Sequence, residues 1–195
     1  MKPWIKLLVV GAAFGVIEGS VVCYLRPYFN RATDDFALRL FTVDALDTFG
    51  RTMLSTELLR ELATLILLAG IAWLLPGSWR KRSSFFAFTF AVWDLTYYAW
   101  LKWRIGWPQS LFDWDILFLI PAPWFAPVLA PVTCSILGII VSMLVVRCED
   151  RGVSWLLGWR TIVPLILALC LWQYSFIEHS FSNCETFPSR YAWPV

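Results

Sequence analysis

Long apolar runs separated by short polar segments dominate the pattern of this chain. Five runs have the length and composition of membrane spans, at about 4–24, 53–75, 84–103, 128–146 and 161–177. Roughly 20 apolar residues in a helix cross the hydrocarbon core of a bilayer. The pattern therefore predicts an all-α fold, a polytopic transmembrane helix bundle of about five spans, with residues 1–195 forming a single integral membrane domain.

One polar connection does not fit a spanning helix. Within residues 27–51, Phe36, Leu40 and Val43 recur at helical spacing among several charges, Asp34 or Asp35 can cap the start, and Gly50 can end the helix. Because the segment is too charged to cross a membrane, it predicts an amphipathic helix lying at the interface.

The apolar stretch 116–146 is too long and too rich in proline to be one regular helix. Each proline removes a backbone donor and clashes with the preceding turn. The residues concerned are Pro121, Pro123, Pro127 and Pro131. We expect residues 116–127 to form a proline-broken segment, partly re-entrant or interfacial, followed by the fourth span.

The first span has a glycine at every fourth position, at Gly11, Gly15 and Gly19. A stripe without side chains lets a second helix approach closely. The lysines before this span and the apolar run that follows also fit a signal peptide. Glu18 stands where a cleavage region would lie, so the span is expected to be retained.

Composition narrows the classes of function. The chain is 59% hydrophobic and 15% charged, and its formal net charge of +2 is too small to suggest a nucleic-acid partner. The five cysteines form no C-x-x-C motif and there is one histidine, so no Cys/His metal framework is indicated, and neither a metal nor a cofactor is assigned. Cys23 and Cys184 are both expected at the outer face, where they could form a disulfide.

The orientation is predicted from the basic residues of the short loops. The Arg80–Arg82 cluster falls between the second and third runs, in a short segment with no acid. Positively charged loops stay on the cytoplasmic side of a membrane. With five spans, this places the N-terminus inside and the C-terminus outside, for a multi-pass protein of the bacterial inner membrane.

Ionisable residues within or beside the spans are the candidate functional residues. Charges at the centre of a spanning helix cost roughly 2.5–3.5 kcal/mol each on insertion scales, so they face partners or water-filled cavities. Their positions along alternating spans place the following residues in the outer half of the bundle: Glu18, Glu57, Arg60, Glu61, Asp94, Tyr98 and Asp115.

Three interpretations of this group stay open. It could be an ion-pair network in which Arg60 bridges Glu18, Glu61 or Asp94 and fixes the packing of helices. It could be a pocket for a cation, a proton or a small polar ligand, since neighbouring carboxylates do not all stay ionised cheaply. It could also face a partner subunit. The tripeptide Asp113-Trp114-Asp115 has the D-x-D spacing with which some transferases hold a metal–diphosphate, although acids are common in interfacial loops.

Three segments resemble a group of small, uncharacterised bacterial multi-span membrane proteins. They are IEGSVVCYLR, ELLRELATLILL and VWDLTYYAWLKWRIGWPQSLFDWDILFLIPAPW, with the elements W-D-x-x-Y-Y and G-W-P-x-S-L-x-x-W-D. The resemblance covers roughly residues 13–133. It implies a bacterial inner-membrane setting and assigns no activity.

The sequence therefore predicts a membrane protein with an acidic polar pocket in the outer half of its bundle. The alternative is a non-catalytic, structural or accessory subunit of a larger membrane complex. The expected partners are the lipid bilayer and, for the alternative, other membrane subunits.

Overall fold

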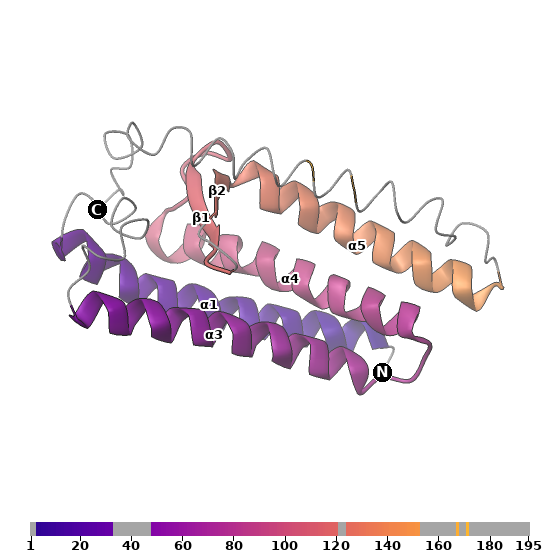
Figure 1. Cartoon of the computed structure of the whole chain (residues 1–195). Coiled ribbons are helices and arrows are strands. Elements are labelled where there is room, and N and C mark those ends of the chain that lie inside the picture. The colour runs from indigo at the N-terminus through magenta and orange to yellow at the C-terminus, as the bar shows by residue number, and fades with distance from the viewer. Residues whose placement is uncertain (1–2, 33–47, 121–123, 153–166, 168–170, 172–195) are drawn as a thin grey trace.

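The computed structural model describes residues 3–32, 48–120, 124–152, 167 and 171, and most of these residues are helical (Figure 1). The helices are α1 (Pro3–Ala32), α3 (Thr48–Trp73), α4 (Trp79–Ile105) and α5 (Leu129–Asp150). Two short strands, β1 (Trp114–Phe118) and β2 (Trp124–Pro127), lie between α4 and α5. The predicted helical character is confirmed, and the strands are an addition to the expected all-α class.

Helix α4 is the centre of the bundle, with α1 and α5 packed most extensively against it and α3 beside α1 and α4 (Figure 1). Helix α1 runs parallel to α4, because Trp4 at its start packs edge-on against Phe85 and Gly19 near its end meets Trp100. Helix α5 runs antiparallel to α4, since Asp150 at its end pairs with Lys81 near the start of α4.

The glycine stripe of α1 faces α4 at very close range. A Cβ built at Gly11 would lie 2.7 Å from the carbonyl oxygen of Thr89, and one built at Gly15 would lie 2.5 Å from that of Trp93. Real side chains do not tolerate these distances, so only glycine permits the two backbones to approach this far. The prediction that the stripe serves close helix packing is confirmed.

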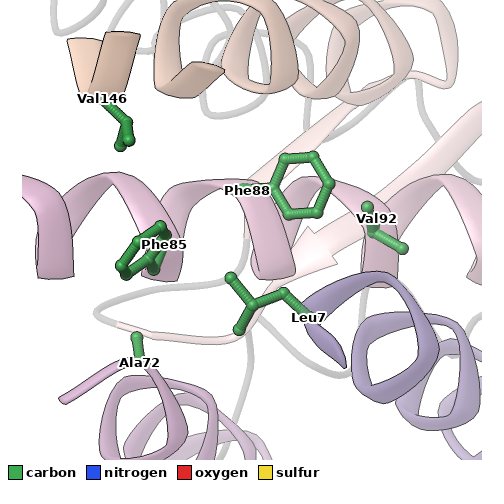
Figure 2. Packing of buried hydrophobic residues seen from close by; sticks show 6 residues of the cluster. All are labelled: Leu7, Ala72, Phe85, Phe88, Val92 and Val146. Carbon is green, nitrogen blue, oxygen red and sulfur yellow. The ribbon is translucent and has the colours of Figure 1, made fainter. Parts of the chain in front are cut away.

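All four helices contribute to the apolar core at the end where α4 begins. Figure 2 shows its side chains converging on α4 from the neighbouring helices. The cluster consists of Leu7, Ala72, Phe85, Phe88, Val92 and Val146. A second cluster, at the other end of α4, consists of Tyr98, Leu101, Trp107 and Val128.

Within the described residues, two helices are long and apolar enough to cross a membrane. They are Pro3–Leu25 and Leu129–Asp150, with mean hydropathies of 2.0 and 2.4. Only 22% of each 18-residue window is buried within the protein, whereas the core helix of a soluble protein is mostly buried. Helices α3 and α4 do not meet the same criterion, because α3 has several charges in its first half and α4 is rich in aromatic and charged residues.

Several predicted boundaries are wrong. Helix α1 continues through Pro27 to Ala32, where the sequence predicted an end at Arg26-Pro27. A proline weakens a helix by one hydrogen bond, but it does not by itself end one. Helix α3 already begins at Thr48, so Gly50 lies inside α3 and does not end a preceding helix. Most of the expected interfacial helix, and nearly all of the fifth span at 161–177, lie outside the described residues.

Helix α4 begins earlier than the apolar pattern predicted. It starts at Trp79, so Arg80, Lys81 and Arg82 lie in its first turn and not in a loop. The hydroxyl of Ser78 caps this turn by accepting a hydrogen bond from the Lys81 amide at 3.3 Å. Such a cap replaces a missing helical partner at the N-terminus, and it extends the helix into a polar sequence.

The proline-rich segment folds mainly as a β-hairpin beside the start of α5. Strands β1 and β2 pair antiparallel, with Asp115 opposite Ala126 and Ile116 opposite Phe125. Pro127 ends β2, and Pro131 lies in the first turn of α5, where a helix needs no amide donor. The amide of Val128 donates to the Asp113 carbonyl at 2.9 Å, which ties the hairpin to the loop before it.

Candidate functional site

Arg60 joins two acids on two helices. Its guanidinium forms ion pairs with Glu57, at 2.6 Å on the same helix α3, and with Glu18 on α1. Its Nε also donates to Glu57 at 2.8 Å. The side chains of Arg60, Glu18 and Glu57 are 28%, 14% and 16% exposed, so the three charges are largely withdrawn from the surface. The group would carry a net negative charge if both carboxylates were ionised.

Glu61 follows Arg60 on α3 and binds the end of the hairpin. Its two carboxylate oxygens accept hydrogen bonds from the amides of Leu119, at 3.0 Å, and Ile120, at 3.4 Å. Glu61 is buried and lies within electrostatic range of Arg60 and Glu18. It therefore connects the Arg60 network to the residues that follow β1.

Asp94 lies near the middle of α4 and faces α5. Its Oδ2 accepts a hydrogen bond from the Ser135 hydroxyl at 2.8 Å. In the part of the chain that the structure describes, neither lysine nor arginine pairs with this carboxylate. A hydroxyl compensates a carboxylate less than a cation does, so the charge of the partly buried Asp94 is poorly compensated.

Tyr98 lies one turn beyond Asp94 on α4 and binds the hairpin. The Tyr98 hydroxyl donates to Oδ2 of Asp115 at 3.1 Å, and both side chains are buried. Both carboxylates lie within electrostatic range of the tyrosine hydroxyl. Asp94, Tyr98, Asp115 and Ser135 thus form a polar line from α5 across α4 to β1.

The contacts divide the predicted residues into two groups rather than one. The first lies between α1, α3 and the residues that follow β1, and it comprises Glu18, Glu57, Arg60 and Glu61. The second lies between α4, α5 and the start of β1, and it comprises Asp94, Tyr98 and Asp115. Residues 114–120 are the segment that both groups contact, the second group through Asp115 in β1 and the first through the amides of Leu119 and Ile120 just after it.

Sequence reasoning missed two partners. Ser135 is one of three hydroxyl residues in the apolar helix α5, together with Thr133 and Ser142, and nothing in the sequence distinguishes it from the other two as the partner of Asp94. The other missed partners are the backbone amides of Leu119 and Ile120. No sequence pattern identifies them, because they are available to Glu61 only where the chain has left strand β1.

The D-x-D tripeptide does not form a converging pair. Oδ2 of Asp113 accepts hydrogen bonds from the amides of Gln109, at 2.7 Å, and Ser110, at 3.2 Å, so this carboxylate closes a turn. Asp115 is engaged with Tyr98 on α4. Among the residues with a described placement, no three His, Cys, Asp or Glu side chains are arranged to hold a metal ion. Cys184 lies outside those residues, so a disulfide with Cys23 stays a prediction.

No family model, curated protein or solved structure matches the chain. The resemblance of residues 13–133 to small bacterial membrane proteins therefore stays a prediction.

Proposed function

We propose that the chain is a multi-pass protein of the bacterial inner membrane, with about five spans, and that its polar groups bind a small cation, for which a proton fits best. The two apolar helices support the membrane setting, because most of their surface is not covered by the rest of the described chain. The close packing of α1 on α4 supports the proposal that α1 is retained as a span, since its glycines lie directly against the backbone of α4.

The observation that carries the proposal is the surroundings of Asp94. This carboxylate lies between α4 and α5, with the Ser135 hydroxyl as its hydrogen-bond partner and no ion pair to a described cation. Keeping such a charge inside a membrane helix costs roughly 2.5–3.5 kcal/mol. A bound proton or cation removes that cost, and the serine hydrogen bond is compatible with either form.

A proton fits the geometry better than a multivalent metal ion. Metal ions such as Ca²⁺ and Mg²⁺ need several oxygen ligands around one point. The described acids instead bind separate partners, with Asp115 on Tyr98, Glu61 on backbone amides and Glu18 on Arg60. Asp94 is the acid left with the least compensation, so it is the proposed proton carrier.

Infrared spectroscopy of the detergent-solubilised protein tests this assignment. We expect a protonated carboxyl band near neutral pH that disappears in Asp94→Asn and shifts in frequency in Ser135→Ala, since the serine hydroxyl no longer donates to the group. Asp113→Asn is the matched control, because Asp113 caps an exposed turn and should leave the band unchanged.

A carboxyl band that persists unaltered in Asp94→Asn would contradict the assignment of the proton. Thermal unfolding with and without Na⁺, K⁺, Mg²⁺ and Ca²⁺ separates the remaining outcomes. Stabilisation of the wild type by one of these ions, lost in Asp94→Asn, would replace the proton with that ion at the same site.

An accessory subunit is the alternative function, and the exposed apolar face of α3 favours it. Leu59 and Ile66 on this face are 68% and 63% exposed. Lipid covers such a face as well as a partner does. Mass measurement of the solubilised protein discriminates the two, because a monomer or homo-oligomer supports the proposed site, whereas stoichiometric co-purification of one other membrane protein supports the accessory role.

A further inference from the structure

The start of α4 and the end of α5 come together in a basic cluster that the proposed function does not use. The Lys81 ammonium pairs with Asp150, and the Ser78 hydroxyl donates to Glu149. These contacts fix the two helix ends against each other. The basic cluster is defined as Arg80, Lys81, Arg82, Arg147 and Arg151, and the two acids beside it are Glu149 and Asp150.

The acids of this end leave most of the positive charge uncompensated. Within the described residues, Lys81 is the member of the cluster that makes an ion pair. The hydrogen bond to Asp150 raises the pKa of Lys81, so this ammonium also stays charged at neutral pH. Arg147 and Arg151 are exposed to solvent. Four arginines are thus available to an external anion.

Two of these arginines have unsatisfied donors. The Nε atoms of Arg80 and Arg82 are buried and make no hydrogen bond in the described part of the protein. A buried donor without an acceptor costs about 1–3 kcal/mol. Residues two positions apart on a helix do not face each other, so separate phosphate oxygens, one beside each arginine, would supply the missing acceptors.

An exposed tryptophan at the start of α4 suits the headgroup region of a bilayer. Trp79 is 65% exposed, and the Arg80 guanidinium lies 5.7 Å from the centroid of its ring. Indole rings favour the headgroup region of a membrane, with arginine and lysine beside them. The first turn of α4 adds the positive end of the helix dipole, which favours a phosphate.

We propose that the basic cluster binds the phosphate of anionic phospholipid headgroups. This inference rests on the membrane setting of the proposed function, but not on its proton site. Guanidinium groups bind phosphate oxygens in bidentate fashion, and anionic lipids are attracted to clusters of basic residues at the membrane surface. The cluster would thereby fix the depth and the orientation of the α4–α5 pair in the bilayer.

Native mass spectrometry of the protein in a neutral detergent tests the proposal. We expect phosphatidylglycerol to bind more tightly than phosphatidylcholine of the same chain length. In the double variant Arg80→Gln/Arg82→Gln, the affinity for phosphatidylglycerol should fall on the order of tenfold, since each basic residue at an anionic surface contributes several-fold to binding. Phosphatidylcholine binding should not change.

Arg104→Gln is the matched control. Arg104 lies at the opposite end of the same helix and also contacts a tryptophan, with its guanidinium 5.6 Å from the centroid of the Trp103 ring. If this variant loses phosphatidylglycerol as strongly as the double variant does, binding is a general effect of charge and the proposed site is wrong. Arg80→Lys/Arg82→Lys keeps the charge and removes only the bidentate geometry, so it should lose less affinity for phosphatidylglycerol than the glutamine variant does.

A second double variant tests the same cluster if the first one does not fold. If Arg80→Gln/Arg82→Gln does not fold, Arg147→Gln/Arg151→Gln removes exposed charges of the same cluster and should weaken phosphatidylglycerol binding several-fold. Equal binding of both lipids to the wild type would overturn the proposal, as would displacement of phosphatidylglycerol by millimolar inorganic phosphate. Extraction of the protein from membranes by alkaline carbonate would instead contradict the membrane setting itself, and is measured separately.

Discussion

At the scale of single residues, Arg60 is the side chain that links acids on two different helices. It is the cation shared by Glu18 on α1 and Glu57 on α3, and it lies within electrostatic range of Glu61. Its loss would leave three acids close together with no opposing charge from the described residues. Acids of this kind are tolerated only when a cation or a proton compensates them.

We therefore expect Arg60→Ala to destabilise the protein by about 2–3 kcal/mol, toward the lower side of the cost of breaking a buried pair because Arg60 is partly exposed. Thermal unfolding in detergent measures the change. Arg60→Lys keeps the charge and should cost less than half as much. Glu57→Gln should be the mildest, since Arg60 keeps its bridge to Glu18.

A melting temperature of Arg60→Ala equal to that of the wild type would mean that these charges are separately solvated and do not act as a network. The same experiment with Asp94→Asn addresses the second polar group. Asparagine keeps the shape and accepts the Ser135 hydrogen bond, so a small change in melting is expected there.

A second prediction concerns the glycine stripe. Gly15→Ala should destabilise the protein by about 1–3 kcal/mol, as overpacking of a close contact does. The new methyl group would meet backbone, with the Trp93 carbonyl oxygen at 2.5 Å and the Tyr97 amide nitrogen at 3.0 Å. Because backbone cannot rotate away, the helices α1 and α4 must separate, and thermal unfolding in detergent records the loss.

Gly70→Ala is the matched control for Gly15→Ala. Gly70 also lies inside a helix, but a Cβ at this position meets nothing within 4 Å. Alanine is a better helix former than glycine by roughly 1 kcal/mol, so this variant should be neutral or slightly more stable. If both alanine variants melt alike, the contact between α1 and α4 is looser than the structure indicates.

At the scale of elements, the sequence predicted the helices better than it predicted the helix ends and the connecting segments. Apolar runs near 20 residues identified all four described helices, because length and hydropathy are properties of a local window. Their ends were missed by several residues at Pro27, Thr48 and Trp79, where a cap or a tertiary contact decides and hydropathy does not.

The hairpin could not be predicted from periodicity. Residues 116–120 read as a short apolar run, which is equally compatible with a strand and a helix. The deciding contacts are long-range, and they are the pairing with β2 and the binding of the Leu119 and Ile120 amides by Glu61. For the candidate site, the sequence identified which charges are unusual, but it did not separate them into the two groups that the contacts define.

The hydrogen bonds from the amides of Leu119 and Ile120 to Glu61 can be tested directly. We expect Glu61→Ala to increase hydrogen exchange at the amides of Leu119 and Ile120 by roughly tenfold or more, because a hydrogen bond to a charged acceptor contributes about 1.5–3 kcal/mol. Exchange monitored by mass spectrometry of peptides covering residues 114–120 measures this. Thr56→Ala on the same helix is a control, since the Thr56 hydroxyl bonds only within α3. Unchanged protection of residues 119–120 in Glu61→Ala would contradict the role of the Glu61 carboxylate in holding this segment.

At the scale of the whole molecule, charge is distributed unevenly between the two ends of the bundle. The end where α4 begins and α5 ends carries the basic cluster and two acids. The opposite end, with the hairpin, carries most of the acids discussed above, including Glu18, Glu57 and Asp115. Figure 1 shows these ends as the α3–α4 connection and the region around β1 and β2. In a membrane, basic ends stay in the cytoplasm.

This asymmetry leads to a prediction about orientation. A reporter enzyme that is active only outside the cytoplasm should be inactive when fused after Gly77, before the basic cluster, and active when fused after Gln109, beyond α4. A reporter active only in the cytoplasm, fused at the same two positions, should give the opposite pattern and controls for expression. The reverse pattern in both series would place the basic cluster outside, and anionic lipids of the inner leaflet could then no longer be its ligand. Equal activity at both positions would mean that α4 does not cross the membrane, and Asp94 would then need no proton to remain inside the bundle.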